Sequence, residues 1–250
     1  MIAARSSRRI VPFILGITLF ALFTPAARAG LIHRYSFTDP TPKDSVGSVD
    51  ATLKGSAKIA DGKLVLDNAD KTSGDSNLAY LEFSSSVLPK GTTVSLVIWF
   101  TVKEAGSFPR LLDLGDKDGA TGQAFIYFTP HTADDNSRIA ISATDTASKT
   151  NIDGARLDDG KAHMAAIVID GDAKKLHIFI DGKEPVASKD LGDNTLDKVR
   201  ATHSWIGRSA FDQDAMLSGS IDEFCVYDNA LTLDQAADLS KAGPHAAITP

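Results

Sequence analysis

Short apolar runs that alternate with polar residues recur along the chain after residue 30, and turn-forming residues separate them. The most hydrophobic of these runs covers residues 93–101. Successive side chains of a β-strand point to opposite faces. The run therefore predicts a strand that turns every second residue from Val94 to Phe100 into a core and places Trp99 on the opposite, mixed face.

Strand and turn signals continue along the rest of the chain. Asp61-Gly62 is a two-residue hairpin signal between two short runs, and residues 161–169 and 176–180 form a pair of longer ones. The last run, residues 221–227, contains Asp222, and simple alternation places Cys225 on the same face as Ile221. Strands spaced about every 8 to 12 residues are typical of a β-sandwich or jelly roll.

One helix is predicted after the last strand. Thr232 and Gln235 have the spacing of a capping box, and Gly243 is a plausible C-terminal cap. A short helix over residues 232–241 would therefore pack on an otherwise all-β fold.

The first 29 residues have the three regions of a secretory signal peptide. Arg5, Arg8 and Arg9 precede an apolar segment, and Ala27-Arg28-Ala29 fits an A-x-A cleavage site. The alternative is an uncleaved membrane anchor, although the apolar segment is shorter than the roughly 20 residues that a span requires. We expect cleavage before Gly30, a single domain over residues 30–250 with no membrane span, and a secreted or periplasmic location.

Composition narrows the classes of partner. The formal net charge is −6, and loss of residues 1–29, which hold four arginines and no acid, would leave about −10. An acidic surface disfavours binding to nucleic acid and to anionic membranes. Cys225 is the only cysteine, so the chain cannot form an intramolecular disulfide.

Several blocks of the sequence resemble the laminin-G-like and pentraxin-like domains. GKAHMAAIVIDGDAKKLHIFIDGK at 160–183 is similar to their central strand pair, and GSIDEFCVYDNALTLDQ at 219–235 is similar to their closing block. The segments 33–37 and 44–55 resemble their opening block. The chain departs from the family pattern at Ala162, where tryptophan is usual, and at Cys225, where arginine is usual. The resemblance implies the concanavalin A-like jelly roll, a sandwich of two antiparallel sheets with one curved, concave face.

The resemblance also implies a structural calcium ion. In relatives the aspartate of the closing strand often coordinates calcium, and Asp222 is the matching residue, while Asp44 in the opening loop could supply a second carboxylate. Oxygen ligands suit this cation. The alternative is that Asp222 only accepts hydrogen bonds from backbone amides across the sheet.

Carbohydrate is the expected ligand class. Sugar sites combine an aromatic ring with polar side chains, and Trp99 and Tyr127 are strand residues that could reach the concave face. The alternative is that both rings fill the core.

Some jelly rolls of this superfamily are glucanases, whose catalytic strand carries E-x-D-x-x-E. The four glutamates of this chain, Glu82, Glu104, Glu184 and Glu223, cannot form that motif, which places the two carboxylates that retaining cleavage requires on one strand face. We therefore expect a non-catalytic recognition domain that binds carbohydrate or another extracellular surface ligand. A diverged glycan hydrolase or lyase and a structural or adhesive protein-binding module are the alternatives.

Overall fold

The computed structural model describes residues 30–103, 106–116 and 123–246. The predicted signal peptide, residues 1–29, lies outside the described residues, as does Glu104.

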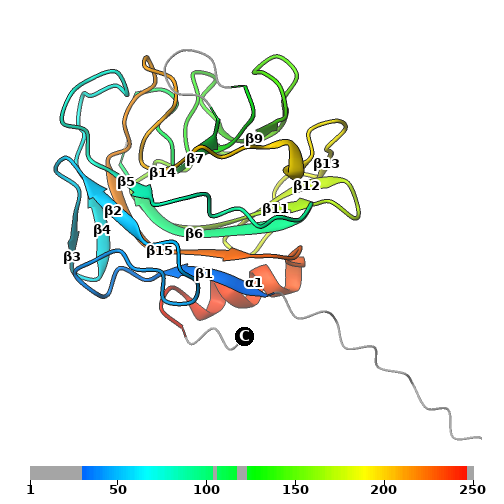
Figure 1. Cartoon of the computed structure of the whole chain (residues 1–250), viewed down its shortest axis with the longest axis horizontal. Helices are drawn as coiled ribbons and strands as arrows, with labels where there is room; N and C mark the ends of the chain where they lie inside the picture. The colour runs from blue at the N-terminus through cyan, green and yellow to red at the C-terminus, as the bar shows by residue number, and fades with distance from the viewer. Residues whose placement is uncertain (1–29, 104–105, 117–122, 247–250) are drawn as a thin grey trace, which may run out of the picture.

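The chain forms two stacked antiparallel sheets, so the predicted jelly-roll sandwich is confirmed (Figure 1). Sheet A has the strand order β13-β12-β11-β6-β15-β4-β3, with β1 paired to β15 outside this path. Its strands are β1 (Leu31–Tyr35), β3 (Lys58–Ala60), β4 (Lys63–Leu66), β6 (Val94–Val102), β11 (Ala162–Asp170), β12 (Lys175–Ile180), β13 (Lys189–Asp190) and β15 (Gly219–Tyr227).

Sheet B has the strand order β10-β9-β8-β7-β14-β5-β2. Its strands are β2 (Ala51–Lys54), β5 (Tyr80–Phe83), β7 (Leu112–Gly115), β8 (Phe125–Thr129), β9 (Ser137–Ser142), β10 (Thr150–Gly154) and β14 (His203–Ile206). A short 3-10 helix, η1 (Leu196–Lys198), lies in the connection between β13 and β14. In Figure 1, long loops rise above sheet B, whereas the helix α1 (Leu233–Ala242) lies below sheet A.

The main core fills the space between the sheets. The even-numbered residues of β6 from Val94 to Phe100 all belong to it, as the alternation predicts, and their side chains meet inner-face residues of sheet B such as Phe128. A second apolar cluster lies on the outer face of sheet A, where Trp99, Cys225 and Tyr227 pack with residues of α1. Sheet A is thus covered on both faces over this region.

Local signals in the sequence account for the turns and the helix ends. Asp61 and Gly62 both have positive φ, 53° and 71°, as a two-residue type I′ hairpin turn requires. The capping box of Thr232 and Gln235 is present at the start of α1, and Gly243 follows its last residue with φ 78°. Neither α1 nor any other helix in the described part of the chain has the length and apolar character needed to cross a membrane.

The closing strand departs from simple alternation. A β-bulge interrupts the register of β15 against β6 between Ile221 and Glu223. Because of the extra residue, Asp222, the side chains that precede it in β15 point to the opposite face from the one that simple alternation predicts. Ile221 therefore points into the main core, whereas Cys225 lies in the outer cluster, so the prediction that these two side chains share a face is wrong.

Candidate functional site

Polar and aromatic side chains form a row on the outer face of sheet B. In β8 the core residues Ile126 and Phe128 alternate with Tyr127, whose side chain lies in a separate outer cluster. The strand register places Asp113 of β7 between Tyr127 on one side and Trp205 of β14 on the other. Three neighbouring strands thus bring a phenol, a carboxylate and an indole side by side on the face from which the long loops rise.

Arg110, two residues before the start of β7, connects this row to the loops. Its guanidinium carbon lies 4.1 Å from the centroid of the Tyr127 ring. Its Nη2 is 2.7 Å from Oδ2 of Asp214, and its Nε is 3.5 Å from Oδ2 of Asp113. Its Nη1 also donates a hydrogen bond to the carbonyl oxygen of Phe108, at 3.1 Å. Arg110 is only 2% exposed, so its charge is buried and is compensated by two carboxylates.

The same carboxylates hold the segment 209–214 against the sheet. Asp113 accepts a hydrogen bond from the backbone N–H of Ala210, at 3.1 Å, and its Oδ1 lies 2.9 Å from Nε2 of His203. The hydroxyl of Ser209 donates to Asp214, at 2.6 Å. The pKa of Asp214 is raised, chiefly by burial, although Arg110 and Ser209 act to lower it. The loop is therefore positioned by contacts that exist without a ligand.

An open cavity of about 210 Å³ lies over this network. We call it the aromatic–cationic pocket, and its lining residues are Phe108, Arg110, Tyr127, Arg138, Thr146, Lys149, Phe211 and Asp214. Arg110 and Tyr127 are almost fully buried, whereas the rings of Phe108 and Phe211 are half-buried. The two loop rings thus offer apolar surface to a ligand, and the charged side chains around them offer hydrogen-bonding groups.

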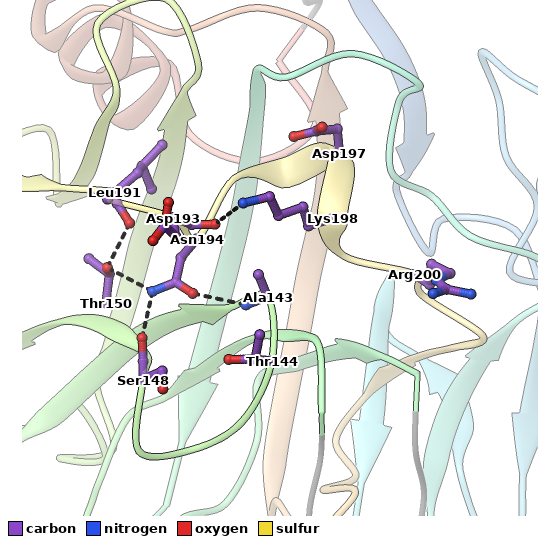
Figure 2. Close-up of a pocket in the computed structure, with 11 residues that line it drawn as sticks. Ala143, Thr144, Ser148, Thr150, Leu191, Asp193, Asn194, Asp197, Lys198 and Arg200 are labelled. Atoms are coloured by element: carbon purple, nitrogen blue, oxygen red, sulfur yellow. Dashed lines mark hydrogen bonds between the residues drawn. The ribbon is translucent and has the colours of Figure 1, made fainter.

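A larger hollow of about 840 Å³ lies on the other side of the β9–β10 loop. Figure 2 shows that the Asn194 side chain points to Ala143, Ser148 and Thr150 in this hollow. Its Oδ1 accepts from the Ala143 N–H at 2.9 Å, and its Nδ2 donates to the Ser148 carbonyl at 2.7 Å. The lining includes no aromatic residue, and the buried amide is engaged within the protein. We therefore interpret this hollow as a place where the Asn194 side chain holds neighbouring loops together, and not as the ligand site.

The two aromatic residues predicted to bind a ligand lie on different sheets. Tyr127 lines the aromatic–cationic pocket, and burial raises the pKa of its phenol. Trp99 lies on the outer face of sheet A, packed in the cluster with α1 and 5% exposed. The expectation that Trp99 reaches the same face as Tyr127 is wrong, because the sheet that carries Trp99 turns its free face to the helix.

The structure also brings Trp99 close to one of the predicted metal ligands. Trp99 and Asp222 both line a cavity of about 360 Å³ beside the C-terminal end of α1, together with residues such as Pro244. Asp222 has a protein partner, since its Oδ1 lies 2.8 Å from Nζ of Lys63.

Asp44, the second predicted metal ligand, is engaged in the opening loop. It accepts hydrogen bonds from backbone N–H groups, including those of Arg34 at 3.1 Å and Gly47 at 2.9 Å, and its Oδ2 is 2.5 Å from Nδ1 of His33. Burial by itself would raise the pKa of Asp44, but these hydrogen bonds together lower it. Within the described ranges no group of three or more His, Cys, Asp or Glu side chains could hold a metal ion. The contacts of Asp44 and Asp222 do not form the oxygen cage that calcium needs, and calcium binding stays a prediction.

Most of the residues that line the aromatic–cationic pocket were not predicted from the sequence. Phe108, Arg110 and Phe211 lie in connections between strands, where alternation carries no information. The one sequence signal for this site was the segment 211–214, which places a phenylalanine and two aspartates in the loop between two predicted strands.

Comparisons with known proteins agree with the fold. A family model described as the concanavalin A-like lectin/glucanases superfamily matches residues 75–237. No curated protein sequence matches the chain.

Three solved structures with the same fold are compared in turn. Domain 4 of AbnA, a GH43 extracellular arabinanase from Geobacillus stearothermophilus, in complex with arabinotriose, has a TM-score of 0.61 and 20% identity, and the alignment covers 85% of this chain and 98% of that one. The CBM40 of Ruminococcus gnavus IT-sialidase, bound to α2,3 sialyllactose, has a TM-score of 0.52 and 17% identity, with coverage of 60% and 83%. The binding domain of botulinum neurotoxin DC, in complex with rat synaptotagmin II, has a TM-score of 0.62 and 12% identity, with coverage of 85% and 51%. This chain thus spans about half of the toxin binding domain, and at these identities the likeness shows the fold alone.

Proposed function

The chain belongs to the concanavalin A-like lectin/glucanases superfamily, and on this basis we propose that it is a glycan-binding domain whose site is the aromatic–cationic pocket. The observation that carries the proposal is the pair of half-buried rings, Phe108 and Phe211, beside a guanidinium that the protein itself holds in place. Sugars present an apolar face to such rings and hydroxyl groups to the polar side chains around them. Two proteins of the same fold, domain 4 of AbnA with arabinotriose and the CBM40 with α2,3 sialyllactose, were solved with bound sugars, which supports this class of ligand.

The glutamates support binding without catalysis. Glu82 pairs with Lys54 at 2.6 Å, and Glu223 is buried against Arg34 at 2.5 Å. They lie on different sheets, so they do not supply the paired carboxylates of a retaining glycosidase. Asp113 and Asp214 approach each other around Arg110, but Asp113 is 1% exposed and cannot contact a substrate.

We also propose that the domain acts outside the cytoplasm, because residues 1–29 have the regions of a cleavable signal peptide. Cell fractionation would test the location, and a protein found only in the cytoplasm would contradict it. N-terminal sequencing of the exported protein would test cleavage before Gly30, and retention of residues 1–29 would favour the uncleaved anchor.

A glycan array with purified protein tests the proposed function. We expect retention of a subset of glycans without release of reducing ends. Phe211→Ala should weaken binding to the retained glycans about 5- to 30-fold, since loss of a central aromatic contact costs about 1–2 kcal/mol. Val46→Ala is the control, because Val46 is 48% exposed in the opening loop, away from the pocket lining.

Three outcomes would contradict the proposal. Release of sugar products would favour the hydrolase alternative, and capture of proteins with no glycan retained would favour the adhesive module. Retention that Phe211→Ala leaves unchanged in a folded protein would place the site elsewhere.

A further inference from the structure

The charges that line the aromatic–cationic pocket differ from those of the protein as a whole. The chain has a formal net charge of −6. The pocket lining nevertheless contains three cations, Arg110, Arg138 and Lys149, and a single carboxylate, Asp214. A ligand in this pocket would therefore meet an excess of positive charge on an otherwise acidic protein.

Of the carboxylates that compensate the two arginines, only Asp214, the partner of Arg110, lines the pocket. Asp153 on β10 pairs with Arg138 through Nε, at 2.6 Å, and Asp113 lies 1% exposed behind Arg110. Asp134 is 3.5 Å from Nη2 of Arg138, but its side chain is 73% exposed and is screened by solvent. Since Coulomb energy falls with distance, a ligand group in the pocket feels the cations more strongly than the carboxylates behind them.

Lys149 differs from the two arginines in its contacts. Its Nζ donates to the carbonyl oxygen of Thr146, at 2.8 Å. Among the residues that the structure describes, no carboxylate lies within 4.0 Å of this ammonium group, whereas Lys161 and Lys175 each contact an aspartate. Lys149 therefore retains its capacity to pair with an anion on a ligand.

The loop that carries Lys149 is ordered by its own hydrogen bonds. Asp145 accepts from the backbone N–H groups of Ala147, at 2.9 Å, and Ser148, at 2.8 Å. The hydroxyl of Ser142 donates to the Asp145 carbonyl. The turn holds the backbone of Lys149 next to the first residue of β10, so a ligand would have to order only the side chain.

We propose that the aromatic–cationic pocket selects an acidic glycan, whose carboxylate pairs with Lys149 and lies beside Arg138 while its sugar ring contacts Phe211. This inference rests on the proposed function, because it names the class of sugar that the same site takes. Phe211 supplies binding to sugars in general, and Lys149 supplies the preference for the charged ones.

Matched oligosaccharides test the inference in the full chain. Each pair has a uronic acid in one member and the corresponding neutral hexose in the other, so the two differ only in a carboxylate against a hydroxymethyl group. We expect calorimetry at low salt to show the acidic member bound about three to ten times more tightly, and this preference to decrease in 0.5 M salt, where charges are screened.

Two lysine variants complete the design. Lys149→Gln should lower the affinity for the acidic member about threefold to fivefold, as expected for an exposed ion pair. The affinity for the neutral member should stay unchanged. Lys198→Gln is the matched control, because Lys198 also donates to a backbone carbonyl at 2.8 Å but lines the neighbouring hollow.

The outcomes separate the two proposals. Equal affinity for both members overturns the acidic preference and leaves the proposed function intact. A preference that survives Lys149→Gln also overturns the inference, because the selectivity would then come from another group. If neither member binds and the glycan array retains nothing, the proposed function fails and the acidic preference fails with it.

Discussion

Removal of the Arg110 guanidinium should destabilise the fold and release the loop over sheet B. Arg110→Met keeps much of the side-chain volume but leaves Asp113 and Asp214 without their shared cation. Loss of one partner of a buried ion pair costs about 3–5 kcal/mol, and loss of the cation–π contact with Tyr127 costs about 0.5–2 kcal/mol. The side chain of Asp214 is 15% exposed, so water partly compensates the lost ion pair. The ion-pair and cation–π costs also overlap, because both arise from the same guanidinium. We therefore expect a loss of about 3–4 kcal/mol.

Urea denaturation at pH 7, followed by tryptophan fluorescence, measures this loss of unfolding free energy. In a separate thermal unfolding experiment the Tm should fall by roughly 10 °C. Arg200→Met is the control, since Arg200 is exposed and the change should stay within about 0.5 kcal/mol. Arg110→Met combined with Asp214→Asn should recover about 1 kcal/mol or more, because it removes one of the uncompensated charges. A loss below about 1 kcal/mol for Arg110→Met would refute the view that this guanidinium holds the loop to the sheet.

The sandwich itself could be predicted because its determinants are local. The alternation of residues 93–101 is that of a strand with one face in the main core, and β6 has this arrangement. The Asp61-Gly62 turn and the Thr232 capping box likewise depend on residues a few positions apart, so they are visible in the sequence.

The bulge in β15 could not be predicted in this way. One extra residue at Asp222 changes the face of Ile221 relative to Cys225, and nothing in the apolar pattern marks where the register shifts. The location of Trp99 was easier to predict from the sequence. A mixed strand face that carries an indole, in a chain with one amphipathic helix, indicates that the helix covers that face, as α1 does.

The pocket depends on contacts between distant segments. Phe108 and Phe211 are far apart in the sequence, and they approach the same guanidinium only because β7 and β14 are neighbours in sheet B. Strand order is a property of the whole sandwich. Residue types in two loops therefore did not indicate a shared site until the topology was known.

Two further predictions concern carboxylates of the opening loop and the last strand. Hydrogen bonds lower the pKa of Asp44, so its stabilising effect is present above the unfolded-state pKa of about 3.9 and is lost as the pH falls below it. Asp44→Asn should cost about 2–4 kcal/mol at pH 7, and the difference from wild type should narrow below pH 4 in denaturation experiments; a constant difference would contradict this. For calcium, the prediction from the resemblance is that a chelator lowers the Tm and that Asp222→Ala removes the difference. The ion pair of Asp222 with Lys63, 2.8 Å long, already supplies a cation to this carboxylate. Lys63→Met then separates the two roles, because it leaves a calcium-dependent Tm shift in place but abolishes stabilisation that comes only from the ion pair. An unchanged Tm in chelator for the wild-type protein would rule out the calcium ion.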